Sequence, residues 1–292
     1  MTTLNVRHRT TYMYRRPVEF GEHRLMCRPR DSHDLRLRGT TLVIDPPASS
    51  LRWMHDVFGN SIAIAAFAQP AQRLVFESAF RAEHFPAEPQ AITLEPYAEA
   101  FPFSYSADDT SDLGRTKERH YCDPEHQIDE WAKSILARTP EGRTFDVLAA
   151  MTTGIKQQFR YAARDEMGVQ TPLDTLALGS GSCRDFAVFM MEAVRSLGLA
   201  ARFVSGYLYD DHLIGAGGGV VGAGATHAWV QVFLPGAGWV EFDPTNAIIG
   251  GRNLIRVAVA RDASQAAPLV GSYNGTPDDF VSMNVSVSVT TE

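Results

Sequence analysis

A cysteine, a histidine and an aspartate in the second half of the chain have the types and the order of a nucleophilic triad. Cys183 follows the run Gly179–Ser182 and begins an apolar segment with helical spacing. A thiol at a helix start ionises more readily than a free one, because unpaired N–H groups and the helix dipole favour negative charge there. The thiolate is the reactive form of cysteine. We therefore take Cys183 as the candidate nucleophile.

A predicted β-hairpin supplies a base and a group to orient it. The strand that begins at His227 alternates, with His227 and Trp229 on one face and apolar residues on the other. Asp243 ends the partner strand, because the proline after it cannot donate to the ladder. Imidazole and carboxylate would share a face, and a helix packed on the sheet would bring Cys183 to the ring. This is the general logic of a catalytic triad.

Each of these residues also has a structural interpretation. A cysteine at a helix start is often a packing residue, and a histidine in an apolar strand often has only a structural partner. An aspartate before proline is often a turn former, and Asp185 can stabilise the start of its own helix. The joint arrangement of Cys183, His227 and Asp243 favours catalysis.

A glycine-rich segment offers a different chemistry. Gly217–Gly222 formally fits the dinucleotide-binding fingerprint. That motif needs a helix directly after it to receive the phosphates, whereas here the strand of His227 follows. We interpret residues 215–225 as a mobile flap beside the active site, and we expect no cofactor.

A metal site and a serine nucleophile can also be considered, but the sequence supports each only weakly. His120, Cys122 and His126 could ligate zinc, but a fourth ligand is missing and the chain has no C-x-x-C pair. Ser182 lacks the G-x-S-x-G elbow of serine hydrolases. We therefore expect neither a metal site nor a serine nucleophile.

Composition narrows the class of partner and the compartment. The 292 residues carry a formal net charge of −7, which argues against a nucleic-acid partner held by bulk electrostatics. No stretch approaches the roughly 18 apolar residues of a membrane helix, and Met1–Arg16 lacks the apolar core of a signal peptide. The three cysteines are far apart and odd in number, so no disulfide framework is implied. We expect a cytoplasmic protein with reduced thiols and no membrane partner.

The first part of the chain has the pattern of strands. Leu4 and Val6, for example, fall on the face opposite Asn5 and Arg7. Several short strands without helical periodicity predict a β-rich, sandwich-like domain over residues 1–105. A polar stretch at residues 106–120 is predicted to be a linker.

From residue 121 the period changes to that of helices and then returns to that of strands. Helices first and strands after, in one unit, predict an α+β core with antiparallel pairing over residues 121–292. We expect one helix that begins at Asp123–Pro124, a second over residues 145–159, and a third from Cys183 to Gly198. The expected strands are 203–209, 227–234, 238–243, 252–261 and 280–289.

Separated motifs in this core resemble the bacterial transglutaminase-like superfamily. The resemblance spans roughly residues 120–260, and the opening segment, with Val6–His8 and Arg28–Arg30, resembles the β-rich region that often precedes this core. It implies a papain-like cysteine-enzyme fold with Cys183 as nucleophile, His227 as general base and Asp243 as the residue that orients the imidazole. A glycine-rich insertion before His227 is its one departure. The motifs are Gly181–Ala187, Leu197–Tyr207, Thr226–Val230 and Trp239–Thr245.

The expected activity is hydrolysis of a peptide or amide bond through a thioester acyl-enzyme, with a peptide or protein as substrate. The backbone N–H of Cys183 is the natural first donor to the oxyanion. Tyr161 and Gln170 are candidates for the second donor, each with an ordinary structural interpretation as well. Two alternatives stay open: transfer of the acyl group to an amine, as in a transglutaminase, and a non-catalytic peptide-binding module. The chain has no calcium loop of the D-x-[DN]-x-[DN]-G type.

Overall fold

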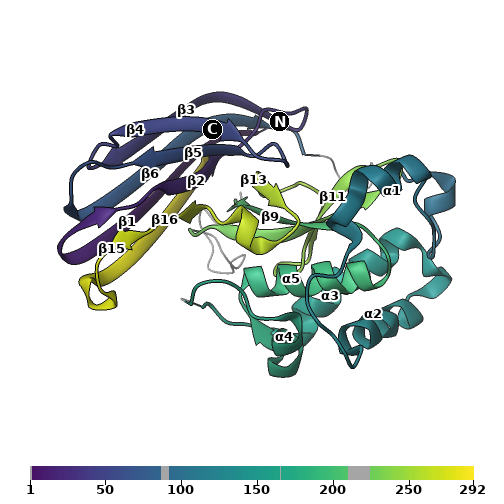
Figure 1. Ribbon diagram of the computed structural model, residues 1–292. Helices are drawn as coiled ribbons and strands as arrows, with labels where there is room; N and C mark the ends of the chain where they lie inside the picture. Colours follow the sequence, from purple (N-terminus) through teal and green to yellow (C-terminus); the bar gives the residue numbers. More distant parts are fainter. Residues whose placement is uncertain (1, 87–91, 165, 210–223) are drawn as a thin grey trace.

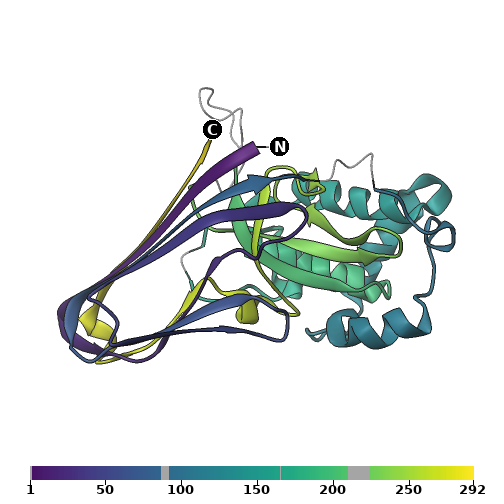
Figure 2. The ribbon, with the colours of Figure 1, turned by 90° about the horizontal axis from the view of Figure 1, so that it is seen from above.

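The chain forms a β-rich part and a mixed helix-and-sheet part that lie side by side (Figure 1, Figure 2). The computed structural model describes residues 2–86, 92–164, 166–209 and 224–292. The sheets pair antiparallel, apart from one short two-stranded element, so the predicted α+β class is confirmed. Within the described residues, no helix is both long and apolar enough to cross a membrane.

Two antiparallel sheets make up the β-rich part. One has the order β15-β1-β6-β3 with β16 also paired to β1, and the other has the order β14-β2-β5-β4. The alternation in β1 buries Leu4 and Val6 and exposes Arg7 and Arg9, as the period of two predicts. The strands are β1 (Thr2–Phe20), β2 (His23–Arg28), β3 (Leu35–Asp45), β4 (Ser50–His55), β5 (Ser61–Ala66), β6 (Ala71–His84), β14 (Leu269–Val270), β15 (Tyr273–Asn274) and β16 (Phe280–Thr291).

The last strands of the chain join the two sheets of the β-rich part, which corrects the predicted organisation. β16 pairs with β1 from Leu4↔Thr291 to Tyr14↔Phe280, and β14 and β15 pair with β2 and β1. The sequence pattern assigns the strand 280–289 to the core over 121–292 and does not indicate β14 or β15. Alternation of polar and apolar residues identifies a half-buried strand, but it does not name the strand's partner. Both ends of the described chain therefore meet in one sheet (Figure 2).

The segment predicted to be a linker contains regular structure. Residues 106–120 include helix α1 (Ala107–Leu113) and a 3₁₀ turn, η3 (Gly114–Lys117). Ser106 accepts a hydrogen bond from the N–H of Asp109 and so caps α1. The polar composition that suggested a linker is also the composition of a helix cap and its first turn.

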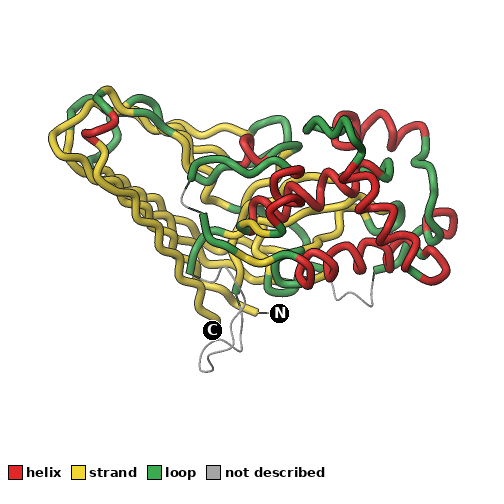
Figure 3. Tube along the Cα trace, turned by 90° about the horizontal axis from the view of Figure 1, so that it is seen from below, coloured by secondary structure: helices red, strands yellow, loops and turns green. Residues whose placement is uncertain are grey.

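The mixed part packs helices against a five-stranded antiparallel sheet of order β12-β11-β10-β9-β13 (Figure 3). The most buried helix is α5, whose Phe186, Phe189 and Met190 lie in the main apolar cluster. The helices are α2 (Gln127–Arg138), α3 (Thr144–Gln158), α4 (Pro172–Leu178) and α5 (Cys183–Ser196), and the strands are β9 (Ala201–Leu208), β10 (His227–Leu234), β11 (Gly238–Asp243), β12 (Ile248–Ile249) and β13 (Leu254–Ala260).

The helix boundaries follow from local capping. α2 begins three residues after the predicted Pro124, because the Asp123 carboxylate accepts from the N–H groups of Gln127 and Ile128 and caps the helix from outside. α5 stops before Gly198, which has a φ of 82°. The sequence pattern did not indicate α4, although Thr171 caps it and Pro172 occupies its first position.

Candidate active site

Cys183 is the first residue of α5, and a capping box fixes the start of that helix. The side chain of Ser182 accepts from the N–H of Asp185, and the Asp185 carboxylate accepts from the N–H of Ser182 at 2.8 Å. Just upstream, the short strands β7 (Arg160–Tyr161) and β8 (Ser180–Gly181) pair in parallel. The turn that carries the thiol is therefore fixed by the capping box on one side and by the pairing of β7 with β8 on the other. Ser182 acts as a helix cap.

Asp185 is a structural carboxylate of this turn. It is fully buried, and its Oδ1 accepts from the N–H of Gln170 at 2.7 Å and from the Arg164 guanidinium at 2.8 Å. Burial raises the pKa of Asp185, but the hydrogen bonds from Gln170, Ser182 and Arg164 outweigh it and hold the pKa below its usual range. The interpretation that Asp185 stabilises its helix start agrees with these contacts.

The hairpin of β10 and β11 has the predicted strands. Gln231 pairs with Glu241, and Val230 pairs with Phe242. This register sets Asp243 across from Trp229, two residues along the strand from His227. The two side chains still meet on the same face: His227 Nε2 donates to Asp243 Oδ2 at 2.8 Å, and both side chains are fully buried.

The Asp243 carboxylate is held by two further donors. Its Oδ1 accepts from the N–H of Thr245 at 2.9 Å, and its Oδ2 accepts from the side-chain amide of Asn246 at 2.9 Å. The same amide nitrogen lies 3.5 Å from His227 Nε2. Sequence reasoning missed Asn246, although an amide three residues after the aspartate, in the turn that ends β11, could have been singled out for its reach back to the carboxylate.

The second ring nitrogen of His227, Nδ1, is the one that Asp243 does not engage. Among the described residues, Nδ1 is buried and has no hydrogen-bond partner of good geometry. Burial lowers the pKa of His227, but the charge and hydrogen bond of Asp243, with a smaller contribution from the nearby Cys183, raise it to about 10. The imidazolium is therefore the stable form at neutral pH, and it lies beside Cys183.

Tyr161 and Gln170 both lie at the turn that carries Cys183. Tyr161 pairs with Gly181, and its pKa is raised by burial and then by the nearby Cys183. The side-chain oxygen of Gln170 accepts from the Thr175 hydroxyl at 3.2 Å. The side-chain amide oxygen of Gln170 thus has a structural hydrogen-bond partner. The oxyanion role of either residue stays a prediction.

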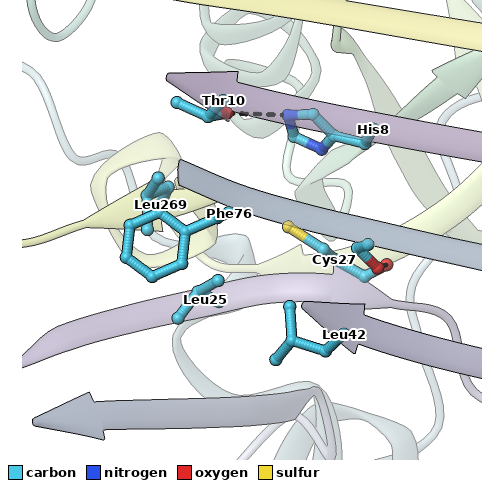
Figure 4. Close-up of a pocket in the computed structure, with 8 residues that line it drawn as sticks. His8, Thr10, Leu25, Cys27, Leu42, Phe76 and Leu269 are labelled. Atoms are coloured by element: carbon cyan, nitrogen blue, oxygen red, sulfur yellow. Dashed lines mark hydrogen bonds between the residues drawn. The ribbon is translucent and has the colours of Figure 1, made fainter. Parts of the chain in front are cut away.

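The other two cysteines lie in different surroundings, and none of the three forms a disulfide. Cys27 points into a cavity of about 10 Å³ in the β-rich part, lined also by His8, Thr10 and Phe76 (Figure 4). Burial raises the pKa of Cys27 to about 12, so this thiol stays protonated at neutral pH. Cys122 is exposed.

The alternative motifs can be placed in the same way. Gly217–Gly222 and the part of the predicted flap up to residue 223 lie outside the described residues. His120 faces Asp262 at 3.5 Å, and His126 bonds to Asp129 at 3.1 Å. Over the described part of the chain, no group of three or more His, Cys, Asp or Glu residues could hold a metal ion.

Two segments of the chain match known family models. Residues 4–83 match the bacterial transglutaminase-like N-terminal region, and residues 129–244 match the transglutaminase-like superfamily. Together they account for more than half of the chain, and the second contains Cys183, His227 and Asp243. The chain belongs to the transglutaminase-like superfamily and carries the bacterial N-terminal region of that family.

Relatives of similar length share both parts. An uncharacterized protein of Mycobacterium tuberculosis is 28% identical over 97% of this chain and 91% of its own length. One from Mycobacterium leprae is 27% identical over 94% of each. The crystal structure of a candidate cysteine protease from Cytophaga hutchinsonii superposes with a TM-score of 0.70 at 17% identity, over 99% of this chain and 90% of that one. The predicted architecture, a transglutaminase-like core preceded by a β-rich region, is thereby confirmed.

Proposed function

We propose that this protein is a cysteine-dependent hydrolase that cleaves peptide or amide bonds through a thioester acyl-enzyme. The supporting observation is the state of the His227 ring. Its Nε2 is fixed by Asp243, and its Nδ1 is buried beside Cys183 with no other partner among the described residues. A ring oriented at one nitrogen and free at the other is suited to move a proton between a nucleophile and a leaving group.

In the first half of the reaction, the Cys183 thiolate attacks the carbonyl carbon and a carbon–sulfur bond forms. The carbonyl electron pair moves to oxygen and gives a tetrahedral oxyanion. When the oxyanion collapses, the carbon–nitrogen bond breaks and His227 Nδ1 gives its proton to the leaving amine. Asp243 stabilises the imidazolium and keeps its Nδ1 directed at the site.

In the second half, water attacks the thioester. Neutral His227 takes a proton from the water as its oxygen bonds to the carbonyl carbon. The carbon–sulfur bond then breaks, the acid leaves, and the thiolate–imidazolium pair is restored. An amine in place of water would give an amide product, which is the transglutaminase alternative.

The oxyanion needs donors aimed at the tetrahedral oxygen. In a helix the first N–H groups have no intrahelical partner, and the capping box engages those of Ser182 and Asp185. The N–H of Cys183, the first residue of α5, is the donor we assign first. Tyr161 or Gln170 would supply the second, and loss of one such donor typically lowers the rate about 10²–10³-fold.

Alkylation with iodoacetamide tests the nucleophile and its base. We expect Cys183 to be labelled faster than Cys27 and Cys122, with a pH dependence that is lost in His227→Ala. Mass spectrometry of the labelled peptides would report each thiol separately. Labelling of Cys183 that is no faster than that of the exposed Cys122, and that is unaffected by His227→Ala, would contradict the proposal and favour a non-catalytic peptide-binding module.

A second experiment separates hydrolysis from acyl transfer. Peptide and amide libraries are incubated with the wild type and with Cys183→Ala, with and without an amine donor and a glutamine-bearing acceptor. We expect free acid as the main product of the wild type and no product from the variant. Cross-linked product in excess over acid would replace hydrolysis by transglutamination.

A further inference from the structure

A buried network of side chains extends from the active-site histidine to the β-rich part of the protein. Trp229 is fully buried, and its indole stacks on the His227 imidazole with ring centroids 6.0 Å apart and planes inclined by 28°. The indole N–H donates to the carboxylate of Glu241 on the neighbouring strand. The ring that packs on the base is therefore itself held by a hydrogen bond.

The backbone beside His227 is shaped to receive this indole. Gly206 on β9 pairs directly with His227. A Cβ at Gly206 would lie 2.6 Å from Cη2 of Trp229 and 2.1 Å from the backbone oxygen of Ile255. Only glycine leaves room there, so the indole is located by close packing on one side and by the Glu241 carboxylate on the other.

Glu241 is fixed by three donors. Besides the Trp229 indole, it accepts from the side-chain amide of Gln231 at 2.6 Å and from Arg256 Nη1 at 2.8 Å. A carboxylate this deeply buried is costly unless it is paired and fully hydrogen-bonded. The Arg256 guanidinium supplies the compensating charge.

Arg256 is in turn bound to the β-rich part. Its Nη2 donates to both oxygens of Asp34 at 3.2 and 3.1 Å, and Asp34 precedes β3. The backbone oxygen of Asp34 accepts from the N–H of Phe85 at 2.7 Å, directly after the end of β6. The chain of contacts from Asp34 to His227 is therefore continuous.

We infer that Glu241 is a positioning residue that holds Trp229 against the His227 ring, and that the N-terminal region secures Glu241 through Asp34 and Arg256. The inference rests on the proposed role of His227 as base. It assigns the β-rich region a part in setting the geometry of the active site, through residues that do not touch the substrate.

The test follows His227 directly. Protein with histidine labelled with ¹³C at Cε1 is prepared as wild type, Glu241→Gln and Trp229→Phe, and the His227 signal is assigned by its loss in His227→Ala. We expect both variants to move the His227 signal, because the ring current of the indole changes, and to shift its titration midpoint. The second-order rate of Cys183 alkylation should fall about tenfold, as expected when a reacting group is slightly misplaced.

A matched control separates this effect from general destabilisation. Glu83→Gln removes a carboxylate at the protein surface that accepts two hydrogen bonds of 2.7 Å from Arg38. It should leave the His227 signal unchanged, whereas Asp34→Asn should move it in the same direction as Glu241→Gln. If Glu241→Gln does not fold, Trp229→Phe decides, since it keeps an aromatic ring at this position and removes the indole N–H that bonds to Glu241.

An unmoved His227 signal in the folded variants, with only a lower Tm, would overturn the inference and leave the network a structural role. The proposed function fails in a different way, through alkylation of wild-type Cys183 that is indifferent to His227→Ala. A His227 signal that moves in Glu241→Gln would support the positioning role even then, because this signal is independent of catalysis.

Discussion

His227 Nε2 donates to Asp243 Oδ2 at 2.8 Å, and this bond decides which ring nitrogen can serve the thiol. Because Nε2 is occupied by the carboxylate, the proton transfer that we propose between His227 and Cys183 falls to Nδ1, which is buried without another partner among the described residues. The aspartate thus fixes both the tautomer and the direction of the imidazole.

Asp243→Asn should abolish most of the activity without unfolding the protein. The variant keeps the shape of the side chain but removes the charge that stabilises imidazolium, and in triads of this logic the loss is about 10²–10⁴-fold in rate. Hydrolysis rates measured beside circular dichroism spectra would check this. A variant with wild-type turnover would exclude Asp243 as the orienting residue.

Asn246→Ala should lower the rate less than Asp243→Asn, by about tenfold. Asn246 donates to Asp243 Oδ2 at 2.9 Å, so its loss removes one of the restraints on the carboxylate and leaves the charge in place. Steady-state kinetics should show the loss mainly in kcat. Asn246→Asp is the contrasting variant: it adds a second negative charge next to Asp243, and its His227 should titrate at a higher pH than in Asn246→Ala.

The raised pKa of His227 predicts a wide pH range of activity with an alkaline limit. Its imidazolium persists up to a pKa of about 10, and the leaving amine needs the proton that it carries. The stabilisation from this group is fully present below the unfolded pKa of about 6.5 and is lost as the pH rises through about 10. Rates and melting temperatures at pH 7, 9 and 10.5 would follow both effects. In Asp243→Asn the alkaline loss of stability should be smaller.

Two histidines between the parts of the protein predict sensitivity to acid. His8 Nδ1 lies 2.9 Å from the Tyr207 hydroxyl, and His84 Nδ1 lies 3.2 Å from the Tyr209 hydroxyl. Burial lowers the pKa of each histidine to about 4. The unfolded chain therefore binds more protons between pH 6.5 and 4, and the free energy of unfolding should fall across this window by at most about 3 kcal/mol per histidine.

Denaturant titrations at pH 7 and pH 4.5 measure that fall. Replacement of His8 by glutamine should reduce the difference between the two pH values, whereas the same change at the exposed His55 should leave it unchanged. An acid loss equal in all three proteins would show that other groups cause it.

Gly206→Ala should destabilise the fold strongly, by about 3 kcal/mol. The added methyl group would lie 2.1 Å from a backbone oxygen that cannot move out of its sheet. Gly39→Ala on β3 is the matched control, since a Cβ there meets nothing within 4 Å. Thermal unfolding of both variants checks the contrast, and similar melting temperatures would contradict the close packing around Trp229.

The elements that depend on contacts between neighbouring segments are those that the sequence predicts best. β10 and β11 begin and end where the alternation indicates, because a hairpin sets its register through its own turn. The start of α5 at Cys183 follows in the same way from its capping residues. His227 and Asp243 could therefore be expected on one face from the hairpin alone.

Contacts between distant segments could not be predicted in this way. The pairing of β16 with β1 joins residues separated by most of the chain, and alternation does not name the partner of a strand. The bond between Asp34 and Arg256 is equally remote, since two charged residues among many give no signal of their pairing. These are the contacts that link the β-rich part to the site.

The pairing of β16 with β1 also sets an order of events during synthesis. β1 leaves the ribosome well before β16, which covers one of its edges and follows only after Cys183, His227 and Asp243 have been made. Until then that edge of β1 is open, and contacts of such long sequence separation form slowly. The helices and the hairpin of the site can thus assemble before the sheet beside them is complete. The pairing of β16 with β1 then completes that sheet.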